Sequence, residues 1–379
     1  MSKNIFIAAS EHYSGKSIVA LGLINMLLSK TQKVGYFKPI INADPSEKRD
    51  DHISTVKDYF NLPFNEADAY AFTRTEALQL AQNMSQGEMI ETIINKFKKL
   101  EETCDFVVIE GSDYVGEGIA FELDGNISIA KNLSAPVIVV VSGASKTTAQ
   151  IITNAITVFQ NFKTRDVQVL AMVVNIVDPK QVEDVKKLLG NQLPKDVINV
   201  VIPVNKSLKS PTLKEIHEHM GGNLLFGKEQ LSNQADHFIT GAMQVPRFLN
   251  HLKENVVIVT PGDRGDIIVA AMLATLSTKY PKVSGMVLSA DAIPEEPIMR
   301  LIEGSQSQFP IISVKTGTFD TTSRLSGIQS RITADNPKRI QLAIDVFEDN
   351  MDTAALEEKI IKFKPEGITP HMFQYQLTK

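Results

Sequence analysis

The sequence is poor in cysteine and lacks any long hydrophobic run. Cys104 is the only cysteine among 379 residues, which excludes an intrachain disulfide and any metal site built from several cysteines. No stretch reaches the ~18 uninterrupted apolar residues that a membrane-spanning helix needs. The chain also lacks internal repeats and low-complexity tracts, and its first residues predict a core strand rather than a signal peptide. We therefore expect a cytoplasmic protein with no membrane partner.

An excess of basic residues is also absent. The chain carries 39 lysine and arginine residues against 44 aspartate and glutamate residues, a formal net charge of −5. Without a basic field, nucleic acid is not expected as a partner. The composition, 43% hydrophobic and 22% charged, is that of an ordinary globular protein, and its length predicts two domains plus a tail.

The strongest motif lies near the start of the chain. The apolar segment 5–9 predicts a strand, a loop of small residues follows, and Gly15-Lys16-Ser17 stands directly before the apolar helical run 18–28. This order of strand, loop and helix is the context that a P-loop requires. Its backbone N–H groups would surround a phosphate, Lys16 would reach the terminal phosphates, and Ser17 would ligate Mg²⁺. The motif predicts a site for ATP or another nucleotide with Mg²⁺.

The loop departs from the usual P-loop pattern at its opening position. Ser10 stands where a glycine is expected, and a Cβ there restricts positive φ angles and the close approach of a phosphate. Ser10 and Ser14 are nevertheless expected to line the nucleotide site together with Gly15 and Lys16.

Apolar runs alternate with helix-length segments through the first half of the chain. Such alternation predicts right-handed βαβ crossovers and a doubly wound parallel sheet with helices on both faces. The expected strands are 5–9, 33–38, 106–111, 137–141, 169–174 and 197–202, and the expected helices are 18–28, around 53–60, 86–101, 146–162 and 180–190.

The strand and helix pattern restarts after a mixed segment. Strands are expected at 256–259, 286–288 and 311–314, and a helix at 267–276. A second, smaller α/β domain therefore follows the first. The expected organisation is a P-loop domain over 1–210, a connector over 211–222, the second domain over 223–350, and a linker helix with a tail that has no core of its own over 351–379.

Three separated sets of residues resemble one protein family. The first domain is similar to dethiobiotin synthetase-like P-loop proteins through Gly15-Lys16-Ser17, Tyr36-Phe37-Lys38-Pro39, Glu110-Gly111 and Val173-Val174-Asn175. The second resembles the DRTGG domain through Asp263-Arg264-Gly265-Asp266, which matches in part. The tail, from Ile368-Thr369-Pro370 to Thr378, looks like the join at which long bacterial phosphate acetyltransferases enter their catalytic domain. In this order the three sets resemble the N-terminal, non-catalytic region of that family.

The family resemblance implies a role and partners. The family transfers an acetyl group reversibly between acetyl-CoA and phosphate, and its catalytic domain would begin after Lys379. The chain is thus expected to be a regulatory and assembly portion, not catalytic alone, whose partners are the C-terminal acetyltransferase domain, further copies of itself in a homo-oligomer, and small-molecule effectors such as NADH and pyruvate. No nucleophile, base and orienting residue form a catalytic set in the sequence.

The same resemblance assigns roles to individual residues of the first domain. Lys38 would face substrate or phosphate, Asp51 and Glu110 would lie beside Mg²⁺ with Ser17, and the amide of Asn175 would contact an adenine edge. Simpler explanations remain open for three of these residues. Lys38 could be a surface lysine that caps a strand, Asp51 a solvated carboxylate in a polar loop, and Asn175 a turn residue. Glu110 closes a buried strand, where a carboxylate is costly without a partner.

In the second domain the pair Asp263 and Arg264 is a candidate ligand site. Asp263 is more simply explained as the N-cap of the helix at Ile267 or as an ion-pair partner of Arg264. Thr316, Thr318 and Thr321 also fit a capping role. The histidines lack the spacing of a zinc site.

Two other functions remain as alternatives. A freestanding ATP- and magnesium-dependent ligase of dethiobiotin synthetase type would use Lys38, but needs neither a second domain nor the tail. An assembly ATPase of the ParA/MinD type carries a further lysine early in its loop, and residues 8–14 contain none.

Overall fold

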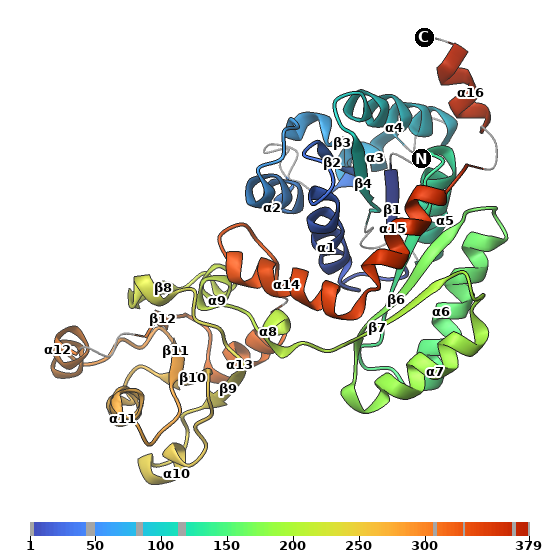
Figure 1. The fold of residues 1–379 in the computed structure, drawn as a ribbon. Coiled ribbons are helices and arrows are strands. Elements are labelled where there is room, and N and C mark those ends of the chain that lie inside the picture. Colours follow the sequence, from blue (N-terminus) through green and yellow to red (C-terminus); the bar gives the residue numbers. More distant parts are fainter. Residues whose placement is uncertain are drawn as a thin grey trace. The chain divides into compact units, whose positions relative to one another are not determined.

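The computed structural model describes residues 4–42, 50–80, 86–112, 119–305, 309–328, 330–365 and 369–377. The chain forms two compact units: Met1–Val204 with Ile332–Lys379, and Asn205–Arg331. Figure 1 labels their helices and strands. Of the tail residues that carry the resemblance, Ile368 and Thr378 lie outside the described residues.

The first unit contains a sheet of seven parallel strands in the order β3-β2-β4-β1-β5-β6-β7. Its strands are β1 (Asn4–Ala9), β2 (Val34–Ile41), β3 (Tyr70–Thr73), β4 (Phe106–Glu110), β5 (Val137–Ser142), β6 (Val169–Val177) and β7 (Ile198–Pro203). Every residue of β1, β2, β4 and β5 is buried. Continuous apolar runs suit this position, since a parallel sheet is covered on both faces.

Helices connect and cover these strands. They are α1 (Lys16–Leu28), α2 (Asp51–Phe60), α3 (Arg74–Leu80), α4 (Gln86–Glu101), α5 (Ile119–Asn132), α6 (Thr148–Lys163), α7 (Val182–Gln192), α14 (Pro337–Asn350), α15 (Thr353–Lys362) and α16 (Pro370–Leu377), with 3₁₀ turns at Glu66–Asp68 and Pro179–Gln181. From the central β1 the chain runs first toward β2 and later toward β5. Right-handed crossovers in opposite directions place helices on opposite faces of the sheet. The predicted doubly wound α/β fold is confirmed.

Several details differ from the sequence-based expectation. The second strand continues past Pro39, because Lys38, Ile40 and Ile41 pair with β3. Strand β3 itself was not predicted; its four residues lie at the sheet edge and are too short for a periodic signal. Helix α5 was also missed. The predicted helix over 86–101 matches α4.

The helix over 337–350 packs in the first unit, whereas the sequence predicted a second domain over 223–350 that includes it. Phe347 of α14 is fully buried, and an ideal Cβ on Gly22 of α1 would lie 2.2 Å from its ring. Asn25 Nδ2 also donates to Glu348 Oε1 at 2.8 Å. Because Gly22 has no side chain, the two helices approach closely. The second unit accordingly ends at Arg331.

The tail also has a packing partner. Helix α16 lies against α4, with Met372 buried and His371 Nδ1 3.5 Å from Glu91 Oε1. The segment therefore packs on the first unit, although its sequence predicted a tail without a core of its own.

The second unit has a five-stranded mixed sheet in the order β8-β12-β11-β10-β9, in which β8 alone is antiparallel to its neighbour. The strands are β8 (Asn223–Phe226), β9 (His237–Thr240), β10 (Val256–Pro261), β11 (Val283–Ser289) and β12 (Ile311–Ser313). The helices are α8 (Lys206–Lys209), α9 (Leu213–Met220), α10 (Val245–Leu249), α11 (Gly265–Leu276), α12 (Glu296–Gly304) and α13 (Thr318–Ser326), with a 3₁₀ turn at Lys228–Gln230. The predicted second, smaller α/β domain is confirmed.

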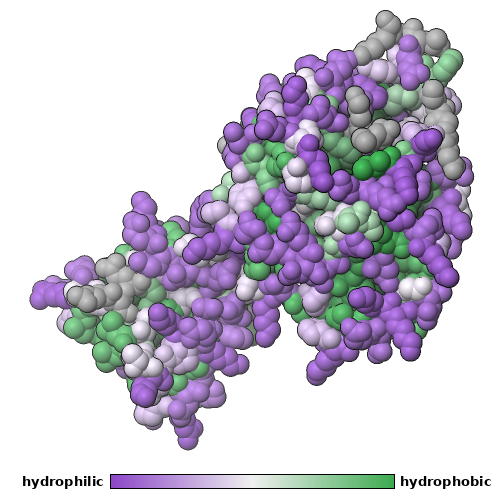
Figure 2. Space-filling view, viewed as in Figure 1, coloured by the Kyte–Doolittle hydropathy of each residue, from purple (hydrophilic) through white to green (hydrophobic). Residues whose placement is uncertain are grey.

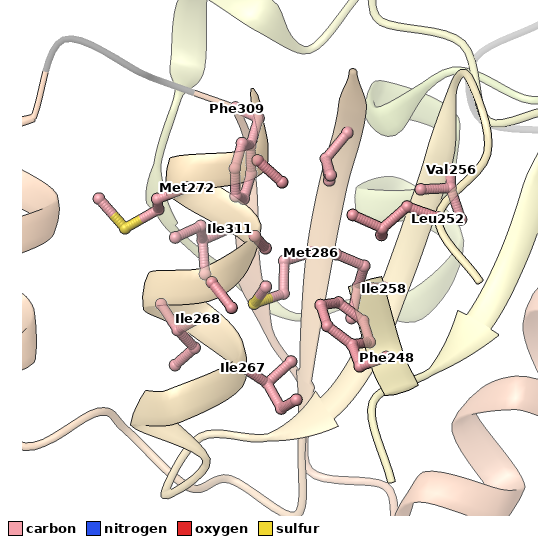
Figure 3. Packing of buried hydrophobic residues seen from close by; sticks show 14 of the residues in the cluster. Phe248, Leu252, Val256, Ile258, Ile267, Ile268, Met272, Met286, Phe309 and Ile311 are labelled. Atoms are coloured by element: carbon pink, nitrogen blue, oxygen red, sulfur yellow. The ribbon is translucent and has the colours of Figure 1, made fainter. Parts of the chain in front are cut away.

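One core cluster joins the sheet of this unit to its helices. Phe248 of α10, Ile267 and Ile268 of α11, and Ile258 and Met286 of the central strands pack together (Figure 3). Their apolar contacts hold the start of α11 against the carboxyl ends of the strands, where the turn containing Arg264 lies.

Hydrophilic side chains cover most of the surface that is visible in Figure 2. Along the described parts of the chain, no helix has both the length and the apolar character needed to cross a membrane.

Candidate functional site

The loop between β1 and α1 has the backbone geometry of a P-loop. Gly15 adopts a left-handed conformation (φ +87°) directly before α1, and an ideal Cβ there would lie 2.1 Å from Asn175 Nδ2. A side chain at this position would be both strained and obstructed. The glycine therefore brings the backbone close to the first turn of α1, where free N–H groups and the helix dipole favour an anion.

Two buried hydroxyl groups of this loop lack hydrogen-bond partners. Ser10 is 6% exposed and Ser14 1% exposed, and neither Oγ contacts a donor or acceptor in the described structure. A buried hydroxyl without a partner costs about 1–3 kcal/mol. Both groups lie in the loop that would surround a phosphate, whose oxygens accept hydrogen bonds. The loop thus fits a phosphate group chemically, even with Ser10 at the position of the usual glycine.

The loop lysine is buried beside the end of β4. Lys16 is 5% exposed, and its Nζ donates to the backbone oxygen of Gly111 at 2.8 Å. The contact fixes the ammonium group between the loop and the Glu110-Gly111 segment. The structure therefore brings together two of the sequence motifs that carried the resemblance.

Three polar side chains gather at the expected magnesium side of the loop. Ser17 Oγ lies 3.1 Å from His52 Nδ1, which in turn lies 3.9 Å from Glu110 Oε1. Glu110 is buried, and its other carboxylate oxygen accepts a hydrogen bond of 2.7 Å from the Tyr36 hydroxyl. The Tyr36 bond partly satisfies the buried carboxylate. Ser17 and Glu110 thus approach a common neighbour, His52.

A buried ion pair supports the adjacent helix. Lys38 Nζ donates to Asp50 Oδ1 at 3.1 Å and to Oδ2 at 2.9 Å. Asp50 also caps α2 by accepting from the backbone N–H groups of His52 and Ile53. Burial favours the neutral acid, but Lys38, His52 and these hydrogen bonds together hold the pKa of Asp50 below its ordinary value. The carboxylate therefore stays ionised near neutral pH.

The partner of Lys38 is thus Asp50, while the role of Asp51 beside Mg²⁺ stays a prediction. Asp51 is exposed on the first turn of α2. Asp50 could have been chosen from the sequence as the N-cap before a helical pattern, since aspartate is favoured there. No sequence signal marked His52, and Tyr36 was noted only as part of the Tyr36-Phe37-Lys38-Pro39 motif, because their roles depend on contacts with α1 and β4.

Asn175 holds the P-loop. Its Nδ2 donates to the backbone oxygen of Ser14 at 2.9 Å, and its Oδ1 accepts from the N–H of Ile176. Ile176 has φ +60°, an unusual angle for a β-branched residue. The amide thus anchors the loop to the end of β6, where the sequence suggested either an adenine contact or a turn residue.

In the second unit, Arg264 contacts the first turn of α11 and the segment that follows β9. It makes two hydrogen bonds of 2.8 Å to Asp266 and donates to the backbone oxygens of Gly241 and Met243 at 3.1 Å. The hydrogen bonds from Arg264 lower the pKa of Asp266. The N-cap of α11 is Arg264, without a side-chain cap, so Asp263 is not the cap. The turn motif therefore ties the end of β9 to the start of α11.

The threonines after β12 do not cap α13, whose N-cap is Gly317. Thr316 and Thr321 share a hydrogen bond of 2.6 Å instead, and Thr318 bonds to Ser289 at 2.8 Å. Across the described residues, no three His, Cys, Asp or Glu side chains form a cluster that could hold a metal ion.

Comparison with known protein families gives two matches that follow each other along the chain. Residues 3–212 match the AAA domain model, and residues 215–328 match the DRTGG domain model. The first match covers more than half of the chain and includes the P-loop.

Similar proteins include two enzymes named phosphate acetyltransferase. The protein from Nitratidesulfovibrio vulgaris is 34% identical over 100% of this chain and 54% of its own length. The protein from Synechocystis sp. is 32% identical over 100% of this chain and 55% of its own length. The chain thus spans about half the length of these relatives. Among solved structures, the MinC:MinD cell division complex of Aquifex aeolicus is similar over 55% of this chain and 84% of that chain, with 12% identity and a TM-score of 0.34.

Proposed function

We propose, for a chain that belongs to the AAA-domain family and carries a DRTGG domain after that domain, a role as part of a phosphate acetyltransferase. The chain would be the regulatory and assembly portion of that enzyme, with a nucleotide-binding P-loop. The reaction, acetyl-CoA with phosphate to acetyl phosphate and CoA, would be performed by a C-terminal acetyltransferase domain. This proposal is supported by relatives of that name, which align with the whole chain and are about twice as long.

The observation that carries nucleotide binding is the pair of unpartnered hydroxyls in the loop. Ser10 and Ser14 are buried without hydrogen-bond partners in the described structure, and they lie beside the left-handed Gly15 and the buried Lys16. A phosphate would satisfy the hydroxyls, and Lys16 would balance its charge. The loop is therefore built for an anion, even though it lacks the usual opening glycine.

A divalent cation such as Mg²⁺ fits the other side of the loop. Ser17 and Glu110 would hold it, since hydroxyl and carboxylate oxygens are the ligands that Mg²⁺ prefers. The bound cation would neutralise the charge of the nucleotide phosphates. Tyr36 would keep the Glu110 carboxylate in one orientation through its hydrogen bond.

The ligase alternative receives less support from the geometry. Such a reaction would need the Lys38 ammonium to hold a second substrate, but both oxygens of the buried Asp50 already bind it. Releasing Lys38 would leave a buried carboxylate without its partner, which is costly. A role in binding without turnover is the simpler function for this site.

Thermal unfolding with ATP, ADP or NADH, each with and without Mg²⁺, tests the nucleotide site. A ligand at 100 times its dissociation constant adds about 2.7 kcal/mol to the stability of the unit that it binds. We expect ATP or ADP to raise the unfolding temperature when Mg²⁺ is present, and Lys16→Ala to abolish this rise. Lys30→Ala, at an exposed lysine beyond the end of α1, is the control and should keep it. The absence of a shift with every nucleotide would contradict nucleotide binding.

A fusion tests the regulatory role. The acetyltransferase half of a relative, joined after Lys379, is expected to differ from that half alone in subunit number and in its response to NADH or pyruvate. Equal oligomeric states and equal responses would argue against a regulatory and assembly role. This chain alone is expected to release no CoA from acetyl-CoA and phosphate.

A further inference from the structure

We propose that His52 is a third protein ligand of the divalent cation, beside Ser17 and Glu110, and that the site therefore selects a transition metal such as Mn²⁺ over Mg²⁺ for the nucleotide complex. The inference rests on the proposed nucleotide site and adds the identity of its metal. It concerns a side chain that no sequence pattern singled out.

The distance between His52 and Ser17 fits adjacent ligands of one cation. An octahedral ion with ligands at about 2.1 Å separates neighbouring donor atoms by about 3.0 Å. The distance from His52 Nδ1 to Ser17 Oγ is 3.1 Å, so these two atoms already have that spacing. Glu110 Oε1 lies 3.9 Å from the same nitrogen and would need to approach by about 1 Å. A small side-chain movement would complete the set of three.

The supporting contacts favour this arrangement over a chance approach. The Tyr36 hydroxyl donates to Glu110 Oε2 at 2.7 Å. The other carboxylate oxygen, Oε1, is the one that approaches His52, and it would bind the cation. His52 stands on the first turn of α2, and the cap of that helix, Asp50, is fixed by the buried Lys38. Groups that orient metal ligands in this way commonly tune a site.

The donor set determines the preferred metal. Mg²⁺ favours oxygen ligands and seldom accepts an imidazole, whereas Mn²⁺ and later transition metals bind nitrogen more readily. The Glu110 carboxylate and the His52 imidazole are too few to bind a cation tightly by themselves. The described residues contain no larger cluster of such groups. Nucleotide phosphate oxygens would supply the remaining ligands. The metal and the nucleotide should therefore bind cooperatively.

A different role for His52 makes the opposite prediction. If the ring only occupied the place of the cation, its removal would free Ser17 and Glu110, and the protein would bind the Mg²⁺ nucleotide more tightly. As a ligand, His52 instead contributes to affinity for Mn²⁺, and its removal lowers that affinity selectively.

The test measures the affinity of the full chain for ADP by calorimetry with Mn²⁺ or Mg²⁺, together with the electron spin resonance of bound Mn²⁺. We expect ADP to bind at least ~10-fold more tightly with Mn²⁺ than with Mg²⁺, and the bound Mn²⁺ to show coupling to an imidazole nitrogen. His52→Ala should remove both the preference and the coupling, and His52→Asn, which offers an oxygen, should retain Mg²⁺ binding without them. His219→Ala, at an exposed histidine of α9, is the control and should change neither.

The outcomes separate the two proposals. The role of His52 would be overturned, and the nucleotide site would stand, if ADP bound in any of three ways. These are binding without nitrogen coupling, binding with equal affinity for the two metals, and tighter binding with Mg²⁺ in His52→Ala. A failure of ADP and ATP to bind with either metal would overturn both. Selective loss of the Mn²⁺ preference in His52→Ala would support the proposed ligand.

Discussion

The side-chain amide of Asn175 donates to the backbone oxygen of Ser14 at 2.9 Å and so joins the end of β6 to the P-loop. The two residues are 161 positions apart in the sequence. Because Asn175 is only 3% exposed, its removal would leave a buried carbonyl oxygen without this donor.

Asn175→Ala is therefore expected to weaken the first unit without any ligand. The free energy of unfolding should fall by about 1–3 kcal/mol, the cost of a buried polar group that loses its partner. Urea denaturation of the ligand-free chain measures it. If stability were unchanged and only nucleotide affinity fell, the amide would serve the ligand and not the loop.

Gly15→Ala should damage the loop more severely than an alanine elsewhere in the unit. The positive φ alone costs about 1–2 kcal/mol, and the new Cβ would meet Asn175 at 2.1 Å. We expect lower stability and loss of nucleotide binding. Gly125→Ala, in α5 with no atom within 4 Å of the new Cβ, is the control and should keep or raise stability by up to ~1 kcal/mol. Equal behaviour of the two variants would refute the strained loop.

The Lys38–Asp50 pair predicts a pH-dependent contribution to stability. Since the pKa of Asp50 is lowered from 3.8 in the folded state, the ionised pair stabilises the fold above that pH. The stabilisation is lost as the pH falls from about 3.8 through the lower folded-state value. Asp50→Asn should lower the free energy of unfolding at pH 7 by about 3–5 kcal/mol, and the difference from wild type should shrink below pH 4. Denaturation across this range measures it; a constant difference would contradict the assignment.

Arg264→Ala should destabilise the second unit. The change removes the hydrogen bonds to Asp266 and to two backbone oxygens, at a cost of about 1–3 kcal/mol. Arg300→Ala, which breaks an exposed pair with Glu296 on α12, should stay within about 0.5 kcal/mol. Nucleotide binding should be unaffected in both. If Arg264→Ala left stability intact but abolished binding of a metabolite, the turn would be a ligand site.

Phe347→Ala tests the placement of α14. Loss of this buried ring against Gly22 should cost about 3–5 kcal/mol, and hydrogen exchange should accelerate in β1 and β2 but not in β10 and β11. Phe373→Ala, at a residue 54% exposed on α16, should have little effect. Faster exchange in the strands of the second unit would show that α14 supports that unit instead.

The sequence alone determined the features that depend on neighbouring residues. Apolar runs of strand length and the helical spacing between them predicted a doubly wound sheet and a second α/β unit, because burial on both faces demands continuous apolar strands. Gly15, Lys16 and Ser17 were identified for the same reason: a P-loop is a local arrangement of strand, loop and helix.

Only the tertiary structure decided which distant residues meet. It paired Lys38 with Asp50, which is buried at the N-cap of α2 next to the exposed Asp51. It brought His52 to Ser17 and assigned Asn175 to the loop. It also packed the helix over 337–350 on α1, where Gly22 leaves room for a ring. These contacts join segments far apart in the chain, so their geometry depends on how the whole sheet is assembled rather than on any local pattern.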